Sequence, residues 1–342
     1  MMIEEKIKNY ASDLGFCKVG ITTVDDFPRA AEETRRRAYP KPLLEQVVAG
    51  THPRGIVPEA RSIIVLAYDY SHIAFPAKLA RHIGRAYLSR TFIPQPGSPA
   101  RDRLDAFEAF LEQEGIPFVP DRVQVNIRAA AQRAGVASYG RNNFSYVDGV
   151  GSFVTLYAYF VMIDLKPDDP APDCACPPNC RACVDACPTH AMAAPFDLDA
   201  KKCVVWNNAV RVRFQMGRDV PEDMRESVGE RVHGCDECQI ACPRNRRALR
   251  NAKDADPLLE AIAAEFSLEN LLHMPEGFFE RCVKPIMYNY VPNDPAIFQR
   301  NAAIAMGNSG DVRFVPDLEG ELDHPDEAVR EAVRWALEQI RR

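Results

Sequence analysis

Two closely spaced cysteine motifs constrain this chain more than any other feature of its sequence. Both have the form C-x2-C-x3-C-P, and they comprise Cys180, Cys183, Cys187 and Pro188, and Cys235, Cys238, Cys242 and Pro243. Nine of the eleven cysteines lie between residues 174 and 242. In a chain of 342 residues such grouping indicates metal binding rather than a disulfide framework.

The spacing favours iron–sulfur clusters. In two-cluster ferredoxins the cysteine that precedes the proline ligates the other cluster, and soft thiolates bind iron well. We therefore predict two 4Fe-4S clusters. The expected ligands are Cys176, Cys180, Cys183 and Cys242 for cluster one, and Cys187, Cys203, Cys235 and Cys238 for cluster two. A pair of zinc sites is the alternative, although zinc ribbons rarely carry the C-x3-C-P ending.

The remaining cysteines need separate interpretations. Cys176 lies one residue further upstream of Cys180 than ferredoxin spacing requires, so Cys174 is an alternative ligand at this place. Cys17 and Cys282 are predicted to be small buried hydrophobic side chains.

Composition divides the chain into three parts. The first, residues 1–168, is predicted to be an α/β domain with helices at 1–16, 100–115 and 125–135 and strands at 17–22, 61–70 and 116–121. The apolar stretches 143–147 and 151–164 are expected to form a strand pair joined by the turn "DGVG". A linker rich in proline and aspartate follows, so residues 169–250 are assigned to a ferredoxin-like double-cluster domain. The last part, 251–342, is predicted to be helical.

The helical part contains a weak internal repeat. The stretch "RNAAIAM" (300–306) aligns with "REAVRWA" (330–336) at an offset of 30 residues, and each follows an Asp-Pro or His-Pro start. Paired helices that stack on their neighbours give this pattern, so we predict a short HEAT-like repeat. Two unrelated amphipathic helices are the alternative.

Charge and hydropathy limit the possible environments and partners. The net charge of −6 does not suggest a general polyanion binder. No run of about 18 apolar residues occurs and the N-terminus does not look like a signal peptide, so we predict a cytoplasmic protein with no membrane span. One basic patch predicts contact with phosphate groups, and it comprises Arg244, Arg246, Arg247, Arg250 and Lys253. A solvated helix face is the other interpretation.

A double-cluster segment fused to a larger α/β domain suggests an electron path to a second cofactor, because clusters alone carry out one-electron chemistry. An external donor such as flavodoxin or ferredoxin would then supply the electrons. We expect a monomer, since this layout needs no partner subunit to complete its site.

Several stretches, in this order, resemble the epoxyqueuosine reductase family. They are "PEARSIIVLAYDY", "PDRVQVNIRAAAQRAGVASYGRNN", "CRACVDACPTHAM", the lone Cys203, "GCDECQIACPRN" and "FQRNAAIAMGNSGD". The resemblance covers roughly residues 1–340. It implies an α/β cobalamin-binding domain, a ferredoxin-like double 4Fe-4S domain and a HEAT-like C-terminal tail. It also implies an oxidoreductase that reduces epoxyqueuosine to queuosine in tRNA, with a core similar to that of reductive dehalogenases.

The resemblance further implies roles for individual residues. Asp121 lies fourteen residues before Gly135 of the "RAG" triplet, where the family has its proton-donating aspartate; a helix N-cap is the alternative. The base-off cobalamin motif Asp-x-His-x-x-Gly is absent, so no histidine is expected on cobalt. The expected cobalamin contacts are Tyr139, Gly140, Arg141, Asn142, Asn143, Gly151, Ser152, Cys235 and Asp236. The glycines can equally serve simple turns.

The sequence also departs from the family pattern. The usual Gly-Trp-Ile-Gly-Lys-Asn-Thr is Ala-Ser-Tyr-Gly-Arg-Asn-Asn at 137–143, and the usual Thr-Gly-Pro-Val after the aspartate is Arg-Val-Gln-Val at 122–125. Two alternatives therefore accompany the expected function. One is a related reductase that acts on a small-molecule electrophile, for example in reductive dehalogenation. The other is a non-catalytic corrinoid-handling or electron-transfer protein.

Overall fold

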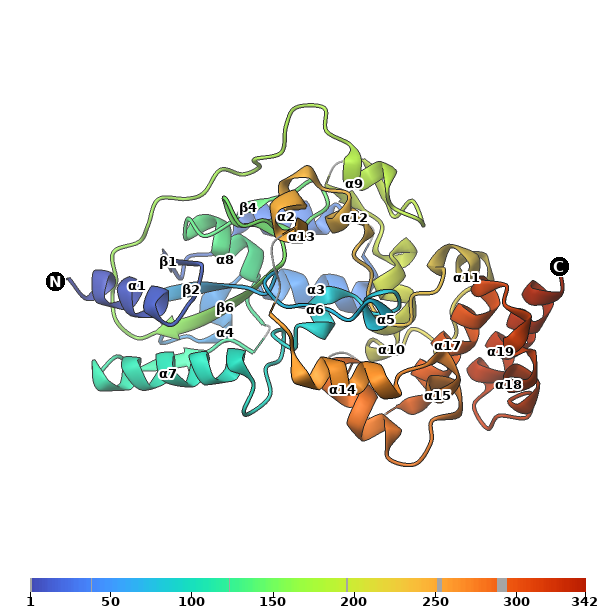
Figure 1. Cartoon of the computed structure of the whole chain (residues 1–342). Helices are drawn as coiled ribbons and strands as arrows, with labels where there is room; N and C mark the ends of the chain where they lie inside the picture. The colour runs from blue at the N-terminus through green and yellow to red at the C-terminus, as the bar shows by residue number, and fades with distance from the viewer. Residues whose placement is uncertain (1, 38, 123, 195, 251–253, 288–293) are drawn as a thin grey trace.

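The structure, a computed structural model, describes residues 2–37, 39–122, 124–194, 196–250, 254–287 and 294–342. Along the chain it comprises an α/β part built on a sheet, a segment of short helices that carries most of the cysteines, and a helical C-terminal part (Figure 1). The ends of the chain lie at opposite ends of the molecule. Among the described residues, no helix has the length and apolar character needed to cross a membrane.

An antiparallel sheet forms the centre of the first part. Its strands, in spatial order, are β1 (Lys18–Thr23), β2 (Ser62–Asp69), β6 (Val154–Val161) and β3 (Phe118–Pro120). The predicted buried strand at 61–70 is confirmed as β2, an inner strand whose first seven residues are buried. A sheet covered on both faces needs apolar side chains on both sides, which explains the unbroken apolar run.

Helices cover both faces of this sheet. The helices of this part are α1 (Ile3–Asp13), α2 (Pro28–Arg35), α3 (Lys41–Ala49), α4 (Pro53–Ile56), α5 (Ala77–Ala80), α6 (Arg85–Leu88), α7 (Pro99–Gln113) and α8 (Ile127–Arg133), of which α5 and α6 lie away from the sheet. Alternate side chains of β2 point to opposite faces: Ile64 packs in one core with Phe107 of α7, and Val65 packs in another with Ala130 of α8. The predicted helices at 1–16, 100–115 and 125–135 are confirmed.

The strand pair expected from residues 143–147 and 151–164 is wrong. The two-residue strand β5 (Ser145–Tyr146) pairs with β4 (Ser138–Tyr139), whereas β6 pairs with β2 and β3. Only an isolated bridge between Val147 and Gly151 connects the two stretches. The eight-residue β6 forms a full ladder with the equally long β2, which the short β5 cannot offer.

The cysteine-bearing segment consists of short elements. They are α9 (Ala182–Asp185), β7 (Met192–Ala194), β8 (Asp197–Leu198), the 3-10 helix η1 (Ala200–Lys202), the π-helix η2 (Trp206–Val210), α10 (Arg211–Arg213), α11 (Glu222–Val228), α12 (Glu237–Ile240), the 3-10 helix η3 (Pro243–Asn245) and α13 (Arg246–Arg250). Helices α9 and α12, one from each cysteine motif, pack against each other. Cys183 lies in α9 and Cys238 in α12, and the loops between these short elements carry the other thiols.

The C-terminal part is helical, as predicted. Its elements are α14 (Pro257–Glu265), α15 (Leu268–His273), the π-helix η4 (Phe279–Val283), α16 (Lys284–Met287), α17 (Pro295–Ser309), the 3-10 helix η5 (Val312–Phe314), α18 (Val315–Gly320) and α19 (Glu327–Arg341). The two stretches of the internal repeat lie in α17 and α19, which pack together closely. At Gly307 of α17 an added Cβ would lie 2.8 Å from Cα of Ala336 in α19.

One stretch of the α/β part, residues 77–88, lies away from the sheet and is called the arm below. The side chains of Leu79, Ile83 and Leu88, from α5, α6 and the loop between them, are buried in the same core as the C-terminal helices. The backbone of this arm also bonds to the cysteine-bearing segment, since Gly84 N–H donates to the carbonyl of His233 at 2.8 Å. The arm therefore ties the three parts of the chain together.

The close contact between α17 and α19 predicts the effect of enlarging Gly307. Gly307→Ala is expected to lower the free energy of unfolding by about 1–3 kcal/mol, because a methyl group here overpacks two buried helices. Gly320→Ala in α18 is the control, since no atom lies within 4 Å of its added Cβ. Urea denaturation compares the two variants. Equal midpoints for both would contradict the packing.

Candidate iron–sulfur and cofactor site

Four cysteines from two distant stretches converge on one small cavity. Its lining contains Cys176, Cys180, Cys183 and Cys242. They come from the loop before α9, from α9 itself and from the residue before η3. Arg141 and Tyr146 of the first part complete the wall. The ligands predicted for cluster one are thus brought together.

Local backbone geometry explains how the first loop brings its thiols together. Asn179 has a left-handed conformation (φ +60°), which asparagine tolerates better than most residues. It lies within a turn in which Cys180 N–H donates to the carbonyl of Pro177 at 3.3 Å. Helix α9 then carries Cys183, so the thiols before and within the helix face the same cavity.

The four ligands predicted for cluster two also lie near one another. Burial raises the pKa of the Cys238 thiol, and the neighbouring Cys235, Cys203, Cys183 and Cys187 raise it further. Backbone N–H groups approach the sulfurs: Ala191 donates to Sγ of Cys187 at 3.3 Å, and the N–H groups of Val205 and Trp206 act on Cys203. Such bonds favour a negatively charged sulfur. The group contains one residue of the first motif, two of the second and the lone Cys203.

Burial keeps the thiols of Cys183 and Cys235 protonated when no metal holds them. It raises the pKa of Cys183 to about 11 and that of Cys235 to about 12. A metal must displace the proton before the sulfur becomes a ligand, so cluster assembly releases protons. Among the described residues, no three His, Cys, Asp or Glu side chains meet closely enough to hold a single metal ion. The sulfurs that hold a cubane bind instead at its separate corners.

The structure separates Cys174 from Cys176. Cys176 lines the small cavity with the other three thiols, whereas Cys174 lines a larger one. The two remain neighbours, because Cys176 N–H donates to Sγ of Cys174 at 3.3 Å. Of the two cysteines predicted to be buried, Cys282 is fully enclosed. Cys17 is half-buried and donates to the carbonyl of Ala67 at 3.2 Å.

The hairpin of β4 and β5, predicted to contact cobalamin, touches the cysteine loops. Arg141 donates from Nη1 to the carbonyl of Cys180 at 3.0 Å, and Asn142 donates from Nδ2 to the carbonyl of Cys238 at 3.1 Å. Gly140 cannot carry a side chain, since a Cβ would lie 2.2 Å from the Tyr146 ring. The side-chain amide of Asn143 is buried, and neither its Nδ2 nor its Oδ1 has a hydrogen-bond partner.

Gly151 and Ser152 lie against the second motif. Ser152 N–H donates to Oδ1 of Asn245 at 2.8 Å, and Gln239 donates from Nε2 to Oγ of Ser152 at 2.9 Å. A Cβ on Gly151 would lie 2.4 Å from the same Asn245 oxygen. These residues therefore hold the second cysteine motif against β6.

Asp236, the neighbour of Cys235, is buried beside Arg85. Its Oδ2 accepts from the Arg85 backbone N–H at 2.8 Å and from Arg85 Nη1 at 3.3 Å. Burial raises the pKa of Asp236 despite this ion pair. Arg85 also lines a third cavity of about 200 Å³ with Phe153.

Asp121 follows β3 directly. Its carboxylate accepts backbone N–H bonds from Gln124 at 3.1 Å and from Val125 at 3.0 Å. The N-cap of α8 is Asn126, whose Oδ1 accepts from Ala129 N–H at 3.3 Å. The interpretation of Asp121 as a plain helix cap is therefore wrong, and its carboxylate shapes the loop between β3 and α8.

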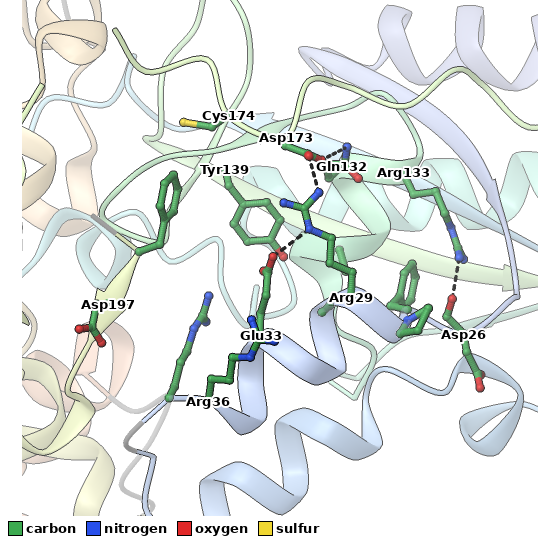
Figure 2. A pocket seen from close by; sticks show the side chains of 16 residues that line it. Asp26, Arg29, Glu33, Arg36, Gln132, Arg133, Tyr139, Asp173, Cys174 and Asp197 are labelled. Atoms are coloured by element: carbon green, nitrogen blue, oxygen red, sulfur yellow. Dashed lines mark hydrogen bonds and ion pairs between the residues drawn. The ribbon is translucent and has the colours of Figure 1, made fainter. Parts of the chain in front are cut away.

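A cavity of about 560 Å³ lies between α2, α8 and the cysteine-bearing segment (Figure 2). Arg29 bridges Glu33 and Asp173, and Tyr139 stands beside them. Burial raises the pKa of Tyr139. Of the predicted cobalamin contacts, Tyr139 alone lines this cavity. Arg29, Arg36 and Arg37 of this wall were not predicted from the sequence, although the run "RRR" at 35–37 was a visible signal.

The exposed arginines of the basic patch follow Cys242. Arg246, Arg247 and Arg250 are exposed on α13. Arg244 is half-buried, with its guanidinium 4.5 Å from the centre of the Tyr146 ring. Lys253 lies outside the described residues.

A family model described as a 4Fe-4S double cluster binding domain matches residues 176–245. This match confirms the prediction of iron–sulfur clusters rather than zinc. Joined to the α/β part and its cavities, the double-cluster domain defines the class of the protein as an iron–sulfur oxidoreductase.

Similarity over the whole chain identifies the family within that class. The chain is 31% identical to the epoxyqueuosine reductase of Staphylococcus aureus, over 99% of this chain and 89% of that protein. It is 30% identical to that of Pseudomonas aeruginosa, over 98% and 94%. The chain belongs to the epoxyqueuosine reductase family, which confirms the resemblance predicted from the sequence.

Two solved structures share the fold. The Bacillus subtilis epoxyqueuosine reductase, solved with its catalytic aspartate loop swung out of the active site, has a TM-score of 0.77 at 27% identity. An epoxyqueuosine reductase with an epoxyqueuosine-modified tRNA-Tyr stem loop has a TM-score of 0.78 at 25% identity. Each comparison covers 99% of this chain and 90% of the other.

The separation of Cys174 from Cys176 leads to a paired prediction. Cys176→Ala is expected to remove or weaken cluster one and spare cluster two, because it deletes one of four converging thiols. Cys174→Ala is the matched control and should retain both. Iron analysis and electron paramagnetic resonance of anaerobically loaded protein measure the outcome. Loss of a cluster in Cys174→Ala alone would reverse the assignment.

Proposed function

We propose that this chain reduces epoxyqueuosine to queuosine in tRNA. The observation that carries the proposal is the similarity to epoxyqueuosine reductases over 98–99% of the chain. One relative of the same fold has been solved with an epoxyqueuosine-modified tRNA stem loop. In this reaction the epoxide opens, an alkene forms and the oxygen leaves as water. Two electrons and two protons are consumed.

The two groups of cysteines are proposed to hold the clusters that deliver these electrons. Cluster one takes Cys176, Cys180, Cys183 and Cys242, and cluster two takes Cys187, Cys203, Cys235 and Cys238. Contact between the groups supports electron transfer from one to the other, because Cys183, Cys187 and Cys238 pack in one small core. An external one-electron donor such as flavodoxin or ferredoxin completes the path.

A second cofactor must act on the substrate, and we propose cobalamin. Two features fit a large amide-rich ligand: the cavity of about 560 Å³ beside Tyr139, and the unpaired buried amide of Asn143 in the same hairpin. The Asp-x-His-x-x-Gly motif is missing, so no protein histidine is expected on cobalt. A base-off form of the cofactor is part of the proposal. When bound, cobalamin supplies the electrons that open the epoxide. Tyr139 and Asn143 would orient it.

Asp121 is proposed to supply the proton that the departing oxygen requires, since an alkoxide leaves poorly unless it is protonated. A relative with a catalytic aspartate loop that swings out of its active site supports this role. In this chain the carboxylate is held by N–H groups of its own loop, so loop and acid would move together.

The tRNA is proposed to contact the exposed arginines of α13, because guanidinium groups bind phosphates strongly. Arg246, Arg247 and Arg250 stand on the helix that follows Cys242. The acidic net charge of −6 makes such a local patch necessary for binding a polyanion.

The domain organisation is proposed to follow the composition. A cobalamin-binding α/β domain spans 1–168, the double-cluster domain 169–250, and a HEAT-like repeat domain 251–342. The packing of α17 on α19 supports the repeat. We further propose a cytoplasmic monomer, as is typical of an enzyme whose cofactors are held by one chain.

The role of Asp121 predicts a specific loss of turnover. Asp121→Asn keeps the shape and the N–H acceptor but cannot donate the acid proton, so activity should fall by about 10²–10⁴-fold. Mass spectrometry of nucleosides from reduced, substrate-loaded reactions measures conversion. Asp148→Asn, at an exposed turn, is the control. Iron and cobalt contents must match the parent. Activity within about twofold of the parent would remove Asp121 from the mechanism.

The proposed tRNA contact predicts a change in salt dependence. Replacing Arg246 and Arg247 with alanine should weaken binding of an anticodon stem-loop RNA and make the slope of log K against log salt shallower by about two. Replacing the exposed Arg341 and Arg342 is the control. If the parent shows no RNA affinity at low salt, tRNA is not the substrate and a small-molecule electrophile becomes the stronger candidate.

A further inference from the structure

A buried polar network joins helix α17 to the segment that carries cluster two. Its members are Arg300, Asn301, Asn207 and Asn208, each at most 2% exposed. Arg300 and Asn301 lie in α17, whereas Asn207 and Asn208 lie in the π-helix η2, which begins three residues after Cys203. Buried polar groups are costly unless every partner is in place, so such a network specifies one arrangement.

Arg300 binds backbone carbonyls of the cysteine-bearing segment. Its Nη2 donates to the carbonyl of Asn208 at 3.1 Å and to that of Asn207 at 3.4 Å. Its Nη1 donates to the carbonyl of Arg218. Burial lowers the pKa of Arg300 to about 9. Its direct acceptors are carbonyl and amide oxygens rather than a carboxylate, which makes this a costly site for a cation and points to a positional role.

Asn301 extends the network to the second motif. Its Nδ2 donates to the carbonyls of Asn208 and Val232, both at 2.8 Å. Val232 precedes Cys235 by three residues. Asn208 makes a further link, since its Nδ2 donates to the carbonyl of Gly234 at 3.4 Å. Arg300 and Asn301 of α17 thus bind the backbone next to both Cys203 and Cys235, which are 32 residues apart.

The contact continues to Cys203 itself. The carbonyl of Cys203 accepts from Asn207 N–H at 3.2 Å and from Asn207 Nδ2 at 3.0 Å. Asn207 is in turn held at its own carbonyl by Arg300. A π-helix is a strained, widened turn that occurs mainly where function demands it. In η2 the carbonyls of Asn207 and Asn208 accept hydrogen bonds from side chains of α17.

We propose that Arg300 and Asn301 are positioning residues for cluster two: they fix the backbone that presents Cys203 and Cys235 at the spacing that one cubane requires. The C-terminal helical part is then a component of the redox centre. This inference rests on the proposed ligand set of cluster two. Residues behind metal ligands typically change metal affinity by about 10–100-fold when they are replaced.

The test measures iron release from the two clusters separately. Full-length protein is loaded anaerobically and challenged with an iron chelator, and the release phases are assigned with Cys180→Ala for cluster one and Cys203→Ala for cluster two. Arg300→Lys keeps a cation but loses the planar fork, and Asn301→Ala removes both amide contacts. Arg225→Lys is the matched control: Arg225 is also buried, but its side chain binds Val220 and Glu331, neither of which adjoins a cysteine.

Release from cluster two should become at least about tenfold faster in Arg300→Lys and in Asn301→Ala, with cluster one unchanged and an altered paramagnetic signal from cluster two. If Arg300→Lys does not fold, the rate of iron release from cluster two in Asn301→Ala alone tests the positioning role. Unchanged release, equal acceleration of both clusters, or the same effect in Arg225→Lys overturns the positioning role. If Cys203→Ala releases no less iron than the parent, the ligand set of the proposed function is wrong and the inference falls with it.

Discussion

The convergence of Cys242 on the loop of Cys176, Cys180 and Cys183 is the constraint on which the rest of the structure depends. These thiols line one cavity although about sixty residues separate the ends of the set. The intervening chain must therefore leave the first motif, turn at Pro188, pass Cys203 and return through Cys235. Its helices and strands are short because most of its residues connect cysteines whose positions are fixed. Such a segment has only a small core of its own, around Cys183, Val184 and Met192, and its buried Val204 and Val220 belong to the core of the C-terminal helices.

A segment with so small a core needs support from both neighbours. On one side, the hairpin of β4 and β5 donates from Arg141 and Asn142 to carbonyls beside the thiols. On the other side, α17 donates from Arg300 and Asn301 to the approaches of Cys203 and Cys235. In both cases the acceptors are backbone carbonyls. The neighbours therefore fix the path of the chain and leave the sulfurs to the metal.

The sequence predicted local features well and long-range pairing poorly. The grouping of the cysteines followed from motif spacing, and β2 followed from an apolar run that only a doubly covered strand explains. The partner of residues 145–146 did not, because a glycine turn marks where a chain bends and not which strand it will join. Arg29, Arg36 and Arg37, which line the cavity of about 560 Å³, were not predicted, since a charged run is usually a solvated helix face. The arm at 77–88 was likewise invisible, because its burial depends on helices nearly 200 residues later in the chain.

The departures from the family pattern at 137–143 can now be explained by contacts. The family residues retained are Gly140, where the Tyr146 ring excludes a side chain, and Asn142, whose amide binds the carbonyl of Cys238. Arginine replaces lysine at position 141 and still donates to the Cys180 carbonyl. Asparagine replaces threonine at position 143, where φ is +64°. A β-branched residue is strained in that conformation and asparagine is tolerated. The cluster loops are therefore held by one changed position, Arg141, and one retained position, Asn142, whereas the changed Asn143 presents an unpaired side-chain amide that a ligand can meet.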